Sequence, residues 1–106
     1  VGNGNADGPV VYTGFRPAWV MIKRTDSTGD WYLYDDKRLG YNIDNNEFYA
    51  NTTNAEQTND RIDLLSNGFK LRNDGSGVNA SSGEYIYMAF AEFPIVSSND
   101  IPTVAR

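Results

Sequence analysis

The sequence contains neither cysteine nor histidine. Without cysteine the chain can form no disulfide bond, and it offers no thiolate as nucleophile or metal ligand. Without histidine it lacks the side chain that most often acts as a general base near neutral pH and that most often ligates metals. These two absences exclude Ser-His-Asp and Cys-His catalytic arrangements and thiolate metal centres.

Basic residues and long apolar runs are also scarce. Nine Lys and Arg residues stand against 14 Asp and Glu residues, which gives a net charge of −5. The basic residues are scattered, so we expect no binding to the phosphate backbone of nucleic acids. No apolar run reaches the roughly 18 residues that a membrane-spanning helix needs, so we expect no membrane insertion.

Aromatic and turn-forming residues are abundant, with seven Tyr, five Phe, two Trp and ten Gly in 106 residues. This composition favours short strands joined by turns, within one domain. Alternation predicts six or seven strands, and turn signals about every ten residues indicate an all-β sandwich or barrel. The predicted strands lie within residues 10–13, 15–24, 30–35, 47–50, 61–65, 69–72 and 84–93.

The densest apolar run, Ala18 to Ile22, predicts a central strand that starts at Pro17 and is buried on both faces. We expect it to form a hairpin with residues 30–35. Asn67-Gly68 predicts a type I′ turn in a second hairpin, and the best helical candidate is Asn54 to Ile62. The predicted core consists of Trp19, Val20, Met21, Ile22, Leu33, Leu64, Phe69, Leu71, Ile86, Met88 and Phe90.

The pattern predicts three regions along the chain. Residues 1–9 form a turn-rich leading loop or linker with nothing to bury, and residues 10–94 form the β-sandwich domain. Residues 95–106 contain a proline and show little alternation of apolar and polar residues. We therefore expect them to form an extended C-terminal tail that leaves the domain.

Three phrases, YTGFRPAWVMIKRTD, SNGFKLR and YIYMAFAE, follow one another in this order. Together they resemble a domain of tailed-bacteriophage virion proteins, mostly tail fibres and other structural proteins, over Gly4 to Pro94. The resemblance implies an antiparallel β-sandwich, jelly-roll or lectin-like, without established catalytic residues. It also implies a location in the virion, in the phage tail or on the capsid surface.

The resemblance therefore implies a non-enzymatic virion module, a tail-fibre or related domain for assembly and for attachment to a host-surface glycan. Its expected partners are other virion subunits, in a homotrimer, and no cofactor is expected. The alternatives are a capsid decoration, cement or fibre-spacer module without a ligand and, with less support, a glycan depolymerase.

The polar segment 36–54 contains the candidate ligand-binding residues. Aromatic rings can stack on the apolar faces of sugars while neighbouring carboxylate and amide groups bind hydroxyls, although aromatic residues serve equally well in cores and subunit contacts. The predicted binding set is Tyr41, Phe48, Tyr49, Asp36, Asn45 and Asn46. A wider aromatic platform would add Trp31, Tyr32 and Tyr34.

Acidic residues raise two further possibilities. Asp35, Asp36, Asp44 and Glu47, with neighbouring asparagines, could supply oxygen ligands for calcium, but their spacing matches no EF-hand loop. Such residues are also the ordinary constituents of turns, so no metal site is predicted. Asp35, Asp36, Asp63 or Glu92 could supply paired carboxylates for glycoside hydrolysis, yet nothing in the sequence fixes the separation of two of them. We therefore expect no catalytic residues.

Overall fold

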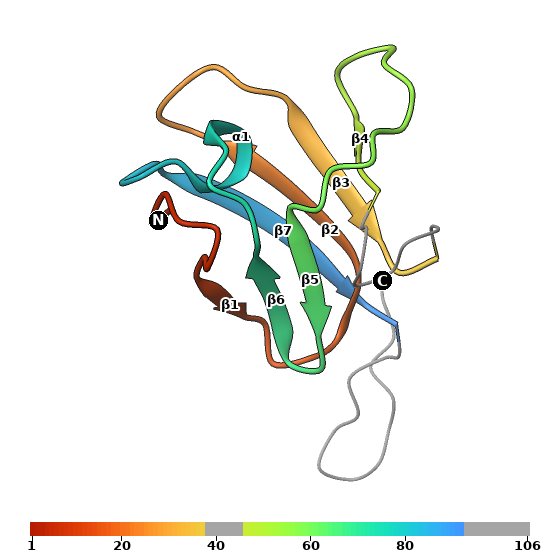
Figure 1. Ribbon diagram of the computed structural model, residues 1–106. Coiled ribbons are helices and arrows are strands. Elements are labelled where there is room, and N and C mark those ends of the chain that lie inside the picture. Colours follow the sequence, from red (N-terminus) through yellow and green to blue (C-terminus); the bar gives the residue numbers. More distant parts are fainter. Residues whose placement is uncertain (38–45, 93–106) are drawn as a thin grey trace, which may run out of the picture.

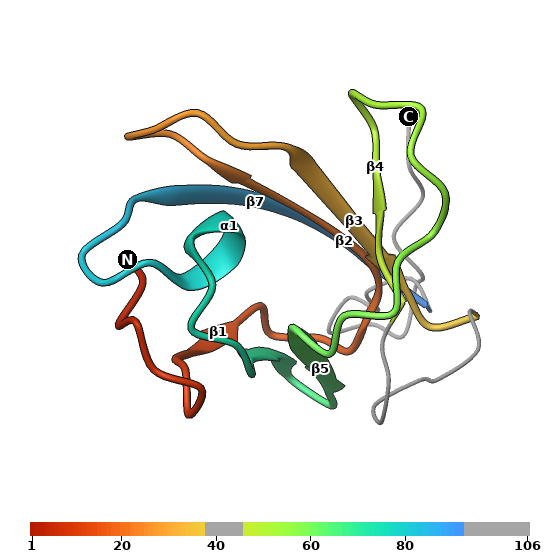
Figure 2. The ribbon, with the colours of Figure 1, turned by 45° about the horizontal axis from the view of Figure 1, so that its top comes forward.

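The computed structural model describes residues 1–37 and 46–92. Two antiparallel sheets lie face to face, one with three strands in the order β1-β6-β5 and one with four in the order β4-β3-β2-β7 (Figures 1 and 2). The elements are β1 (Val10–Tyr12), β2 (Pro17–Arg24), β3 (Trp31–Asp35), β4 (Phe48–Tyr49), β5 (Ile62–Leu65), β6 (Gly68–Leu71), α1 (Ser76–Asn79) and β7 (Tyr85–Ala91). The predicted all-β antiparallel sandwich is confirmed.

Strand β2 is the centre of the four-stranded sheet, because β3 pairs with one of its edges and β7 with the other. Its hairpin partner is the predicted one, with Met21 opposite Leu33. No helix among the described residues has the length and apolar composition that crossing a membrane requires.

The core lies between the sheets and follows the alternation of the strands. Val20 and Ile22 point inward from β2, and Tyr32 and Tyr34 point inward from β3. The other buried members of this cluster are Ile62, Leu64, Phe69, Leu71 and Val78. Six residues of the predicted core are buried in the structure: Val20, Ile22, Leu33, Leu64, Phe69 and Leu71. Leu33 is the exception in position, because it is buried on the outer face of the four-stranded sheet, opposite Met21, and not between the sheets.

The prediction that Ile86, Met88 and Phe90 belong to the core is wrong. Their side chains are 53%, 49% and 56% exposed and lie on the outer face of the four-stranded sheet. Trp19 and Met21, which pair with Phe90 and Met88, are also on this face and only partly buried. The inner residues Val20 and Ile22 of β2 are therefore fully buried, whereas its outer residues Trp19 and Met21 are only partly buried.

Two local predictions are corrected as well. Residues 54–60 contain no helix, and the helical turn α1 lies instead at Ser76–Asn79, where Val78 enters the core with no exposed surface. Figure 2 shows α1 between the two sheets. Its one inward-pointing valine is too little apolar signal to predict a helix from the sequence.

The second hairpin forms as predicted, but its turn is Ser66-Asn67 rather than Asn67-Gly68. Neither Asn67 nor Gly68 has a positive φ, so this is not a type I′ turn. Gly68 belongs to β6, where it pairs with Leu65 on one side and Tyr12 on the other. A Cβ at this position would overlap the carbonyl oxygen of Val11, so glycine is required here for close strand approach.

Residues 1–9 pack against the domain through backbone and side-chain contacts. The amide of Gly2 donates to the carbonyl of Gly83 at 2.8 Å, and the amide of Gly8 donates to the carbonyl of Leu71 at 3.1 Å. Asn79, which is fully buried, accepts from the amide of Asn3 and donates to the carbonyl of Asn5. This leading segment is turn-rich, as its composition indicates, and it is also fixed to the sandwich.

Replacing Gly68 by alanine should lower the free energy of unfolding by about 3 kcal/mol, because β1 would have to move away from β6. Gly29→Ala is the matched control. A methyl group there meets only the Cβ of Arg24 at 3.8 Å, so the change should stay within about 0.5 kcal/mol. Chemical denaturation of both variants measures the difference, and equal stabilities would contradict the close approach.

Candidate binding surfaces

The outer face of the four-stranded sheet carries apolar side chains from all four strands. Strand pairing places Phe48, Leu33, Met21 and Met88 side by side in one row across β4, β3, β2 and β7. On one side of this row Trp19 lies beside Phe90, with ring centroids 5.4 Å apart. On the other side Trp31, Lys23 and Ile86 form a third row. We call this surface the outer apolar face.

The outer apolar face contains a hollow of about 220 Å³, lined by Met21, Lys23, Trp31, Ile86, Tyr87 and Met88. Lys23 is its one cationic residue. The ammonium group lies 5.9 Å from the centre of the Trp31 ring and also donates a hydrogen bond to the carbonyl of Arg24 at 2.5 Å. The hollow therefore offers thioether, aliphatic and aromatic surface with few polar groups.

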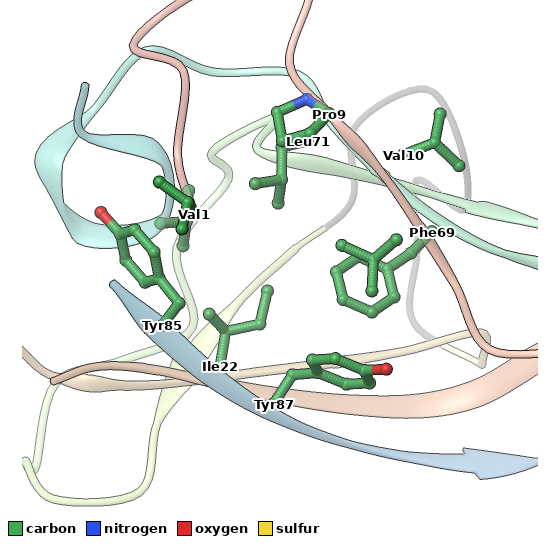
Figure 3. Close-up of a pocket in the computed structure, with 10 residues that line it drawn as sticks. Val1, Pro9, Val10, Ile22, Phe69, Leu71, Tyr85 and Tyr87 are labelled. Carbon is green, nitrogen blue, oxygen red and sulfur yellow. The ribbon is translucent and has the colours of Figure 1, made fainter. Parts of the chain in front are cut away.

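A second hollow, a cleft of about 270 Å³, lies between the two sheets. Its walls come from the leading segment, β1, β6, α1, β2 and β7, and Figure 3 shows Ile22, Phe69, Leu71 and Tyr87 pointing into it. Val10 and Tyr87 are about half exposed, so the cleft reaches solvent between β1 and β7. The hydroxyl of Tyr85 is already bonded, donating to the carbonyl of Ser76 and accepting from the amide of Ala80, both at 2.8 Å.

The described members of the predicted sugar-binding set, Phe48, Tyr49, Asp36 and Asn46, do not all share one surface. Phe48 and Tyr49 are neighbours on β4, so alternation sends Phe48 to the outer face and Tyr49 to the inner face, against Tyr32. The amide of Asn46 donates to Glu56 at 2.6 Å, and the side chain of Asp36 is only 4% exposed. Tyr41, Asn45 and Asp44 lie outside the described residues.

The inward turn of Tyr49 is explained by a buried carboxylate that sequence reasoning missed. Glu47 is fully buried and accepts hydrogen bonds from the hydroxyls of Tyr34 at 2.5 Å and Tyr49 at 3.1 Å. The amide of Asn59 donates to it at 2.8 Å, and Arg61 Nε lies 3.0 Å from the same oxygen. The Arg61 N–H is not aimed at that oxygen, so this last contact is an ion pair rather than a hydrogen bond.

Burial and the nearby negative charge of Glu47 change the acidity of three tyrosines. Desolvation, reinforced by Glu47, raises the pKa of Tyr49 to about 12. The same causes raise the pKa of Tyr34 well above its usual value, and burial raises the pKa of Tyr32. The neutral phenol is thus the stable form within this cluster, where it donates to the carboxylate.

Of the acidic residues considered for catalysis or calcium binding, Asp63 has its own partner, whereas Asp35, Asp36 and Glu92 all contact Lys37. Asp63 pairs with Arg72 at 2.9 Å, and Glu92 pairs with Lys37 at 3.0 Å. Asp35 accepts from the amide of Lys37, whose side chain lies 3.8 Å from Asp36. Within residues 1–37 and 46–92, no three acidic residues gather in an arrangement that could hold a metal ion.

These observations define a small all-β domain of two antiparallel sheets with a partly exposed apolar outer face. Residues 1–94 match the model of the family described as domain of unknown function DUF7483, and the chain belongs to this family. No curated protein and no solved structure matches the chain.

Tyrosine ionisation should separate the Glu47 cluster from the other tyrosines. Because the folded pKa values of Tyr34 and Tyr49 exceed the unfolded value of about 10, their contribution to stability is complete below about pH 10. The contribution of Tyr49 is lost as the pH rises through about 12, and that of Tyr34 is lost as the pH rises through its own raised pKa. Ultraviolet titration of tyrosinate should show a late-ionising group, absent in Tyr34→Phe/Tyr49→Phe. Uniform titration of all tyrosines in the folded chain would contradict the cluster.

Glu47→Gln should lower the free energy of unfolding by about 3 kcal/mol, because Arg61 loses its buried counter-charge and the tyrosine hydroxyls lose a charged acceptor. Glu84→Gln changes an exposed carboxylate in the same way and should cost less than about 0.5 kcal/mol. Thermal and chemical denaturation compare the two variants. A Glu47→Gln protein as stable as the wild type would show that the carboxylate does not hold the sheets.

Proposed function

We propose that this chain is a non-enzymatic structural module of a tailed-phage virion, a tail-fibre or related domain, that assembles with other virion proteins through its outer apolar face. The observation that carries the proposal is the continuity of that face across four strands. Contiguous exposed apolar surface on a small domain is typical of a protein contact site. The resemblance of the sequence to virion proteins supplies the setting.

The chemistry of the face supports a protein partner more strongly than a sugar. Aromatic residues and methionine are enriched at the centres of protein interfaces, and Trp19, Trp31, Met21 and Met88 are residues of these types. A sugar site would need several directed polar groups beside the rings. Here Lys23 is already bound to the Arg24 carbonyl and lies over Trp31, and Asp35, beside Trp19, already accepts from the amide of Lys37.

Attachment to a host-surface glycan is the other part of the virion hypothesis. The described residues support it less, because Phe48 and Tyr49 point to opposite faces and Asn46 is bonded to Glu56. A decoration, cement or spacer role without a ligand agrees with the same outer face. A depolymerase role has less support, because Asp63 is paired with Arg72, and Asp36 and Glu92 are both paired with Lys37.

Trp31→Ser should reduce incorporation of the chain into particles by about 30-fold, as expected for loss of an aromatic residue at the centre of an interface. The test complements phage that lack this reading frame with wild-type or variant chain and quantifies the chain in purified particles. Tyr12→Ser removes a more exposed aromatic from the other sheet, 72% exposed, and should leave incorporation unchanged.

Absence of the wild-type chain from particles would contradict the proposal. Equal incorporation of Trp31→Ser would show that the outer apolar face is not the contact surface. A glycan array with the same purified chains separates attachment from assembly: glycan binding by a chain that does not assemble would favour the attachment role.

A further inference from the structure

The two sheets have four edge strands, and three of them are short or carry a charge. β4 has two residues, and β1 has three and follows Pro9. β5 has four residues and contains Asp63. Short edges, prolines and charged side chains are the ordinary means by which proteins prevent edge-to-edge pairing.

Strand β7 lacks all of these features. It is seven residues long, with the sequence YIYMAFA, and contains no charge, proline or glycine. In the described part of the chain it pairs with β2 only, so its other edge presents unpaired backbone groups. Ile86, Tyr87, Met88 and Phe90 are each about half exposed along this edge. An edge of this kind is a template for a further strand.

We propose that β7 pairs with β7 of a second copy of this chain, in antiparallel orientation about a two-fold axis perpendicular to the sheet. The two four-stranded sheets then become one continuous sheet, and their outer apolar faces join. This inference names one partner for the assembly function proposed above, and it rests on that function for its role in the virion.

The sequence of β7 selects one register for this pairing. A two-fold axis perpendicular to the sheet keeps the outer side chains of both copies on the outer side. Each outer residue of one strand therefore pairs with an outer residue of the other, and each inner residue with an inner one. With the axis at Met88, all seven residues are paired, Ile86 faces Phe90, and Tyr87 faces Ala89. With the axis at Tyr87, the two Tyr87 rings would oppose each other and fewer residues would pair. The Met88 register sets the large Tyr85 and Tyr87 against the small Ala91 and Ala89 on the inner side, and it gives the longest overlap.

The exposed area at the edge sets the expected strength. Four side chains of about 200 Å², each half exposed, provide roughly 400 Å² per copy, about half of what a standard stable interface buries on each side. The backbone hydrogen bonds of a seven-residue ladder add to this. We therefore expect a dimer with a dissociation constant of order micromolar, so the oligomeric state should depend on concentration.

Sedimentation velocity across the micromolar range tests the pairing. The wild-type chain should shift from monomer to dimer mass as its concentration rises. Met88→Lys places two like charges opposite each other at the axis, and Met88→Glu does the same, so each should weaken dimerisation about 100-fold. An equimolar mixture of the two variants should restore a dimer, because lysine then faces glutamate.

Met21→Lys is the matched control. Met21 lies in the same row of the outer apolar face and pairs directly with Met88, but it is on the central strand. Edge pairing should tolerate this change, whereas stacking of two outer faces would not. Circular dichroism confirms that each variant remains folded before its mass is interpreted.

Several results would overturn the inference. The first is a wild-type chain that stays monomeric across the whole concentration range, or that has the mass of a trimer, as the fibre hypothesis expects. The second is a Met88 variant that dimerises like the wild type. The third is an equimolar mixture of the two Met88 variants that stays monomeric. A monomeric chain that still enters particles would overturn this inference alone. A dimer that never enters particles would overturn the proposed virion function and leave the pairing intact.

Discussion

The buried carboxylate of Glu47 is the interaction on which the arrangement of the two sheets most depends. It contacts Tyr34 of β3 and Tyr49 of β4 in one sheet, and Asn59 and Arg61 just before β5 of the other. A buried charge without these partners would cost several kcal/mol, so every one of the contacting segments is held in one position. Asn79 has a comparable role near the other end of the sandwich, where it fixes residues 1–9 through Asn3 and Asn5. Between these two polar anchors lies a continuous apolar core.

The position of Glu47 also determines the outer apolar face. Because Glu47 holds Tyr49 inward, the alternation of β4 turns Phe48 outward, where it continues the row formed by Leu33, Met21 and Met88. The hydrogen bond between Glu47 and Tyr49 therefore stabilises the core and also places Phe48 on the outer apolar face. The aromatic residues expected to form one sugar platform are divided between a core and a surface, and this division is what favours a protein partner.

Much of the fold can be predicted from the sequence, since strand alternation, the dense run at Ala18–Ile22 and the turn residues indicate both hairpins and the two-layer architecture. The face of β7 could not be predicted in this way. Its sequence is apolar on both sides, so alternation gives no preference, and the inner face is selected by contacts distant in sequence, such as the Phe69 and Tyr87 rings 5.4 Å apart. Glu47 was missed for a similar reason: its partner Arg61 is far along the chain, and a glutamate in a polar segment otherwise indicates solvent. Gly68 looked like a turn residue because its close neighbour, β1, is not visible in local sequence.

The distribution of charge favours self-association at the free edge of β7 over other parts of the surface. A net charge of −5 on 106 residues opposes non-specific association between copies. Any self-association must therefore occur where charge is locally absent, and β7 has seven consecutive uncharged residues at a sheet edge. The run YIYMAFA is readable from the sequence, but only the fold shows that it lies at an edge and that the centre of its free side is Met88. The pairing proposed above would be a closed, two-fold contact, since an edge that has paired with its own copy has no further edge of this kind to offer.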